Sequence, residues 1–189
     1  MQPQLPTPEM SAVYQEIVEA KSNIDAMNKV INDARKQLAQ QIQDIQASGG
    51  YNELLAKQAE ATEKLAKLME EANTKLLRFG NELAYLDVQE KPLQVSFSYK
   101  EKLDLLLARF KAAKKFLDNA VDTAKQEAAK TTQTVKRVVQ YPFRQKSSLR
   151  AVAMPIEGIA AIMTGVNQFI SGIDEAQQEL QQLELDLGV

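Results

Sequence analysis

The sequence predicts an all-α fold: an elongated antiparallel bundle of about four long helices with coiled-coil-like packing, forming a single helical domain over residues 1–189. Apolar residues recur with helical period through four segments of roughly forty residues each. The breaks between the segments fall at Gly49–Gly50 and near Pro92 and Pro142. Short connections between such long helices favour an up-down-up-down order.

The chain opens with a proline-rich stretch, which predicts an extended arm over residues 1–7 and a helix over 8–47. Thr7 can cap the free N–H groups of this helix, and Pro8 is tolerated at its first position. Gln41 interrupts the apolar seam, the row of side chains that faces a partner helix, either as a register-fixing residue or near a frayed end. The seam residues are Met10, Val13, Ile17, Ala20, Ile24, Met27, Ile31, Ala34, Leu38 and Ile45.

A second helix is predicted over residues 52–90. The step from Ala72 to Leu76 departs from a strict heptad and predicts a stutter. Gly80, inside this helix, indicates a close helix contact or a slight bend. The seam is assigned to Leu54, Ala61, Leu65, Leu68, Ala72, Leu76, Phe79, Leu83 and Leu86.

Residues 91–98 are predicted to form an extended crossover, because apolar and polar residues alternate there and into Tyr99. Its apolar side chains either cap one end of the bundle or offer an edge to a partner strand. The candidate partner-binding residues are Leu93, Val95, Phe97 and Tyr99.

The third helix is predicted over residues 99–140, with Ser98 and Glu101 at the spacing of a capping box. Alanines dominate the middle of its seam, so a neighbouring helix can approach closely while little apolar area is buried per turn. The seam is Leu103, Leu106, Phe110, Ala113, Leu117, Ala120, Ala124, Ala128, Val135 and Val138.

The fourth helix is predicted over residues 149–187, either kinked at Pro155 or beginning near it. Gly158, Gly165 and Gly172 recur every seven residues on one face, where a second helix can pack closely. The predicted seam is Val152, Ile156, Ile159, Met163, Val166, Ile170, Ile173, Leu180, Leu183 and Leu187.

Charge is unevenly distributed over the last two helices. Residues 100–150 hold thirteen cations against five acids, whereas residues 151–189 hold six acids and no Lys or Arg. The two helices either complement each other or leave a basic face that attracts anionic lipid. Nucleic acid is not favoured, because arginines and aromatics are not interleaved. The candidate anionic-surface residues are Arg109, Lys111, Lys114, Lys115, Lys136 and Arg137.

Residues 151–173 carry one charge, Glu157, and approach the length of a membrane span. They predict the most buried helix of the bundle. Alternatively, the segment is stored in a soluble bundle and later meets a bilayer, which resembles helical pore-forming toxins in architecture alone. The candidate membrane or packing residues are Ile156, Ile159, Ile162, Met163, Val166, Phe169 and Ile170.

The composition argues against an enzyme. The chain contains no His and no Cys, which removes the usual general base, the thiolate nucleophile and the commonest metal ligands. Glycine-rich phosphate loops are also missing. We therefore expect no catalytic residues, no cofactor, no metal site and no small-molecule substrate.

The predicted function is that of a helical scaffold, assembly factor or adaptor that binds a protein partner or further copies of itself through its helices. The alternative is a membrane-active helical protein that uses the apolar segment 151–173. The N-terminus lacks a basic leader and an apolar core, which predicts a cytoplasmic location. Secretion by a non-classical route stays an alternative.

Overall fold

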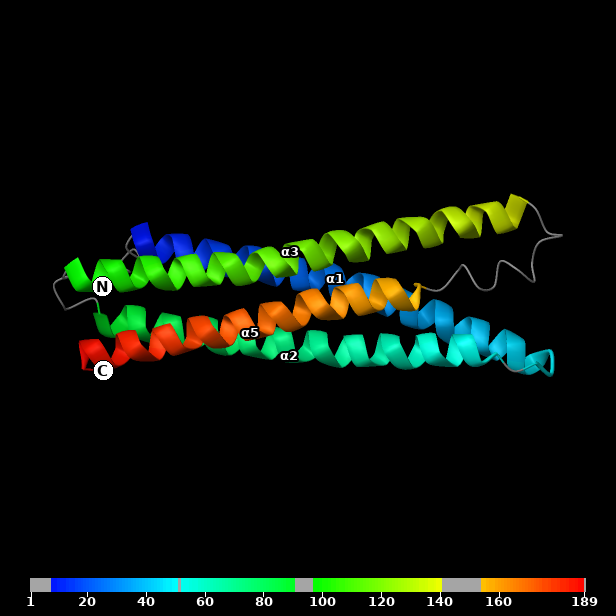
Figure 1. Ribbon diagram of the computed structural model, residues 1–189, viewed down its shortest axis with the longest axis horizontal. Helices are drawn as coiled ribbons and strands as arrows, with labels where there is room; N and C mark the ends of the chain where they lie inside the picture. Colours follow the sequence, from blue (N-terminus) through cyan, green and yellow to red (C-terminus); the bar gives the residue numbers. More distant parts are fainter. Residues whose placement is uncertain (1–7, 51, 91–96, 141–153, 189) are drawn as a thin grey trace, which may run out of the picture.

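The computed structural model describes residues 8–50, 52–90, 97–140 and 154–188. Within these ranges the chain forms four helices, α1 (Pro8–Ala47), α2 (Glu53–Glu90), α3 (Phe97–Gln140) and α5 (Ile156–Leu187). Figure 1 shows long rods that lie side by side, each running opposite to the one before it in the chain. The predicted elongated bundle of antiparallel helices is confirmed.

The four helices surround the bundle axis in the order α1, α2, α5, α3. Among the described residues, α1 packs against α2 and α3, and α5 packs against the same two helices. Helices α2 and α3 therefore occupy opposite corners although they follow each other in the chain. Because consecutive helices alternate in direction, the neighbours α1 and α3 run parallel, and so do α2 and α5 (Figure 1). The bundle consists of two antiparallel hairpins, α1–α2 and α3–α5, packed side by side.

The turn between α1 and α2 confirms the break predicted at the double glycine. Gly49 has a φ of +79°, a left-handed conformation that favours glycine at a helix C-terminus. The N–H of Gly50 donates to the carbonyl of Ile45 at 3.0 Å. On the other side of the turn, the side chain of Asn52 accepts the N–H of Leu54 at 3.0 Å and caps the start of α2.

The core follows the predicted seams of α1 and α3 closely. From Met10 to Leu38 the assigned α1 residues are buried, apart from the half-buried Ile17, and in α3 they are buried from Leu103 to Ala124. At the centre, the rings of Phe79 and Phe110 stack with centroids 5.3 Å apart and an interplanar angle of 6°. Because Phe79 belongs to α2 and Phe110 to α3, this pair joins the two opposite corners across the axis.

The seam predicted for α2 was wrong in its first half. Leu54 is 37% exposed, and Ala61 and Leu68 are only half-buried. The buried positions keep an unbroken three-four spacing, so the predicted stutter is absent from α2. Two of these positions hold the polar residues Gln58 and Thr62, so a pattern of apolar residues alone did not include them. The observed seam is Leu55, Gln58, Thr62, Leu65, Met69, Ala72, Leu76, Phe79, Leu83 and Leu86.

In α5, the predicted seam is right in the middle and wrong at its edges. Ile156 is 36% exposed and Met163 is half-buried, whereas Ile162 and Phe169 are fully buried. The helix begins at Ile156 and not at residue 149, because Met154 and Pro155 are not helical. Pro155 has an extended ψ of 146° and its carbonyl accepts the N–H of Ile159 at 3.0 Å.

Helix α3 begins at Phe97, two residues earlier than predicted. Phe97 and Ser98 are therefore helical and do not belong to an extended crossover. Ser98 lies in the first turn and not at the N-cap, so the predicted capping box is wrong. The predicted arm over 1–7 and the remainder of the crossover, 91–96, lie outside the described residues.

Candidate interaction surfaces

Gly158, Gly165 and Gly172 of α5 lie against α3, the last two of them against alanines, which brings these two helices close together. A Cβ atom at Gly172 would lie 2.5 Å from the Cβ of Ala113, and one at Gly165 would lie 2.9 Å from the Cβ of Ala120. At Gly158 a Cβ would lie 2.8 Å from the side chain of Glu127. The three glycines of α5 are seven residues apart, and so are the residues of α3 that they face, in the opposite order along the chain. The two antiparallel helices therefore keep one register along this contact.

Ion pairs at the edges of this contact join the basic α3 to the acidic α5. The guanidinium of Arg109 lies 3.1 Å from Glu179 and 3.5 Å from Glu175, and Lys102 pairs with Asp186. The interpretation that the last two helices complement each other in charge is confirmed at these positions. Most of these side chains are partly exposed, so each pair fixes register more than it adds stability.

Helices α2 and α5 are also bridged by polar contacts. The ammonium group of Lys75 donates to both carboxylate oxygens of Asp174 at 2.9 Å. The amide of Gln177, one turn further along α5, donates to Glu82, which lies two turns further along α2. Four acidic residues of α5 thus have cationic partners on the neighbouring helices: Asp174 on α2, and Glu175, Glu179 and Asp186 on α3.

A cluster of charges joins α1 to α3. Lys114 donates to Glu16 at 2.9 Å and also to Glu19, while Asn23 donates to Asp118. Desolvation opposes the charge on Lys114, but the hydrogen bonds to the two carboxylates prevail and raise its pKa to about 12. The side chain of Lys114 is only 13% exposed, so this cation belongs to the bundle.

Asp118 is less favourably placed within this cluster. Burial raises the pKa of its carboxyl; Lys114 acts in the opposite direction, and the acids Asp122, Glu19 and Glu16 raise it further. A carboxyl whose pKa is higher in the folded than in the unfolded protein favours folding most at low pH. That contribution is lost as the pH rises from the ordinary aspartate value through the raised one.

Asp118→Asn is therefore expected to stabilise the protein at pH 7, since the amide removes the charge and keeps an oxygen that accepts the hydrogen bond from Asn23. The gain should shrink below pH 3.8, where the wild-type carboxyl is protonated in both states. Urea unfolding at a series of pH values measures it. A variant that is less stable at pH 7, or equally stabilised at every pH, would contradict this account.

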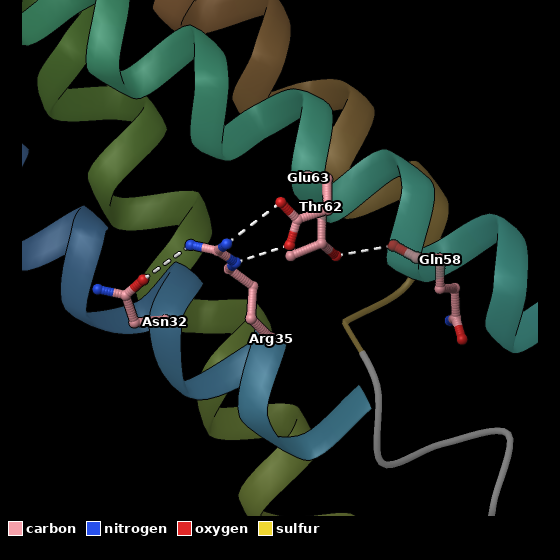
Figure 2. A network of polar contacts seen from close by, with 5 residues as sticks. All are labelled: Asn32, Arg35, Gln58, Thr62 and Glu63. Carbon is pink, nitrogen blue, oxygen red and sulfur yellow. Dashed lines mark hydrogen bonds and ion pairs between the residues drawn. The ribbon is translucent and has the colours of Figure 1, made fainter. Parts of the chain in front are cut away.

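Helices α1 and α2 are joined by the network drawn in Figure 2. Arg35 donates to the two carboxylate oxygens of Glu63 at 2.7 and 3.2 Å, and to the amide oxygen of Asn32 at 3.4 Å. The hydroxyl of Thr62 donates back to the carbonyl of Gln58 at 2.8 Å within α2. This fork-like pairing fixes the register of the hairpin.

Polar side chains are also buried inside the α1–α2 hairpin. Gln41 is 7% exposed, which shows that it lies in the seam and not at a frayed end. The amide of Gln58 donates to the carbonyl of Met154 at 3.3 Å, just before α5 begins. Tyr14 donates to the buried Asp87 at 3.4 Å; burial, together with this carboxylate, raises the pKa of Tyr14 to about 12.

The candidate partner-binding residues do not form one described surface. Leu93 and Val95 lie outside the described residues, and of Phe97 only the helical backbone is described. Tyr99 is 3% exposed and belongs to the core, so it packs within the bundle instead of facing a partner.

The candidate anionic-surface residues also separate into groups. Arg109 and Lys114 take part in the ion pairs described above. Lys111 and Lys115 are exposed on the outside of α3. Lys136 and Arg137 belong to α3, but their side chains are outside the described set.

Most of the candidate membrane or packing residues pack in the core. Ile159, Ile162, Val166, Phe169 and Ile170 are buried, and Met163 packs against the same cluster. Of the helices in the described part of the chain, α5 alone has the length and apolar composition of a membrane span.

Several large apolar side chains are exposed on the outside of the bundle, which the sequence did not lead us to predict. Val18 and Leu77 line a hollow of about 230 Å³ between α1 and α2, and Phe116 lines one of about 410 Å³ between α3 and α5. Leu105 and Leu185 are 44% and 72% exposed. In the sequence Val18, Leu77, Leu105 and Phe116 each stand one position off a seam residue, and Leu185 stands two positions off, which is the signal that marks them.

The described residues include no group of three or more acidic side chains placed to hold a metal ion. Comparison of the chain with protein families, curated proteins and solved structures finds no match.

Proposed function

We propose that this chain is a non-enzymatic helical scaffold or adaptor that binds protein through the outer faces of its helix pairs. One observation carries the proposal: apolar side chains gather beside hollows on the outside of a bundle whose core is already closed. Single exposed apolar residues are common on soluble proteins. Val18 of α1 and Leu77 of α2 instead line one hollow between their helices, and Phe116 of α3 lines another between α3 and α5, so each hollow offers an apolar contact where another helix can pack.

The test combines two measurements on the intact chain. Light scattering over a hundredfold range of concentration reports self-association, and capture from the native lysate reports other partners. We expect either a defined oligomer or a stoichiometric complex. A chain that stays monomeric throughout and enriches no protein would contradict the proposal.

A second candidate function, membrane binding, is favoured by the apolar composition of α5. Here Lys111 and Lys115 would attract anionic lipid, because both are exposed, whereas Lys114 is engaged with α1. Flotation with anionic and neutral vesicles at low salt tests it. Binding to anionic vesicles that is lost in Lys111→Glu/Lys115→Glu would support it, and no binding to either vesicle would dismiss it. Ile159→Asp is a poor probe of insertion, because Ile159 is in the core.

A further inference from the structure

The outer side of the α3–α5 pair carries a row of exposed, uncharged side chains, broken by one charged residue on each helix, which we call the neutral face. Residues three, four and seven apart share one side of a helix. On α3 and α5 the uncharged members with this spacing are all exposed. They are Leu105, Ala112, Phe116 and Asn119 of α3, and Ala161, Thr164, Gln168, Ser171, Gln178, Gln182 and Leu185 of α5.

The charges within the neutral face neutralise each other. Glu175 interrupts the row on α5 and Arg109 interrupts it on α3, and these two form an ion pair with Glu179 beside them. Lys111 and Lys115 each precede a member of the row by one residue, so they point about 100° away around α3. The outer surface of a soluble bundle is ordinarily rich in charge, whereas the centres of protein interfaces are depleted of it.

This chemistry restricts the partner. A charged partner would bury its charges here without counterions, which is costly. A lipid headgroup would find no free cation among the described side chains of the face. A second copy of the chain presents the same neutral row, and its amides and hydroxyls are self-complementary because they both donate and accept hydrogen bonds. Such a pairing has two-fold symmetry, the commonest arrangement of soluble dimers.

The dimensions of the face also suit a dimer. At 1.5 Å per residue the row extends about 36 Å on α5, from Ala161 to Leu185, and about 21 Å on α3, from Leu105 to Asn119, and each helix is about 10 Å wide. The face therefore covers about 570 Å², close to the roughly 600 Å² per partner at the lower end of specific interfaces. The hollow beside Phe116 and Gly172, about 410 Å³, leaves room for side chains of the other copy.

We infer that two copies of this chain associate through the neutral face of α3 and α5. The inference rests on the proposed function, since it names one partner and one surface for the same helix-helix binding.

Cysteine cross-linking tests the surface directly, because the chain has no cysteine of its own. Thr164→Cys, Gln168→Cys and Ser171→Cys place single thiols along the middle of the row. We expect mild oxidation to yield a disulfide-linked dimer for at least one of them. Glu70→Cys, at an exposed position of α2 on the opposite hairpin, is the control and should stay monomeric on a denaturing gel.

A charge placed in the face tests its contribution to binding. Gln168→Lys buries an unpaired charge in the face of each copy and should raise the dimer dissociation constant by on the order of tenfold or more. Glu70→Lys makes a charge change outside the face and should leave that constant unaltered. Circular dichroism and thermal unfolding confirm that both variants keep the fold.

Three results would overturn the inference. A dimer that survives Gln168→Lys, or that cross-links at Glu70→Cys and not on the neutral face, uses another surface and leaves the proposed scaffold function intact. A monomer that captures a different protein rejects the second copy as partner but keeps that function. If the chain is monomeric, captures no protein and floats with vesicles, the dimer and the proposed scaffold function are both rejected, and lipid binding is favoured.

Discussion

Phe110→Ala is expected to lower the free energy of unfolding by about 3–5 kcal/mol. The Phe110 side chain is fully buried, and its ring stacks on Phe79 at the centre of the bundle. Truncation leaves a cavity where the side chains of α2 and α3 meet across the axis, between two helices whose backbones do not lie next to each other in the described residues. Urea unfolding followed by circular dichroism measures the loss.

Phe116→Ala is the matched control, because it makes the same substitution six residues along the same helix. Phe116 is 39% exposed, so its loss should cost less than about 1 kcal/mol. A double-mutant cycle between Phe79 and Phe110 should give a coupling of about 0.5–1.5 kcal/mol from the aromatic contact. Equal losses at Phe110 and Phe116 would show that the stacked pair does not lie at the centre of the core.

Gly172→Ala is expected to lower the free energy of unfolding by about 1–3 kcal/mol, as overpacking does in a tight contact. The new Cβ would lie 2.5 Å from the Cβ and 3.1 Å from the Cα of Ala113, and a backbone atom cannot yield as a flexible side chain can. Helix α5 must move away from α3, which loosens the contact along its length. Thermal and urea unfolding report the effect.

Gly80→Ala makes the same change where there is room. A Cβ at position 80 would lie 3.8 Å from the Cγ2 of Ile17, an ordinary contact, so the better helix propensity of alanine should add up to about 1 kcal/mol. Ala113→Gly combined with Gly172→Ala should recover part of the lost stability. If the two glycine replacements change stability in the same direction, close approach is not what Gly172 provides.

The apolar spacing of α1 was sufficient to predict its buried face, because nearly every position of that seam is apolar or small. In α2 the same reasoning assigned the wrong residues to the first half of the seam, because the polar residues Gln58 and Thr62 occupy buried positions there. Whether a polar residue lies in a seam can be decided only from the groups that surround it in the folded structure. Gln58 is bonded to the carbonyl of Met154, which is distant in sequence.

The glycine spacing of α5 predicted a close contact but not its partner. Ala113 and Ala120 lie at the same seven-residue spacing, yet Ala124 and Ala128 belong to the same seam of α3, and only the register selects the first two. The lateral order of the helices could not be predicted either, because short connections permit α3 to follow α2 at an adjacent or at an opposite corner. The neutral face depends on that order.

The opposite placement of α2 and α3 also bears on how the chain reaches this structure. Within the α1–α2 hairpin the separation of contacting residues grows from a few positions at the turn to 73 at Tyr14 and Asp87, whereas the hydrogen bonds between the hairpins join residues 95 to 99 positions apart. Closing such long loops is the entropically costly and slow part of folding. We therefore expect docking of the two hairpins over their full length to be the slow step. The stack of Phe79 on Phe110 closes a shorter loop than any of these hydrogen bonds between the hairpins, so we expect it to form before docking is complete and to influence the rate of folding as well as that of unfolding.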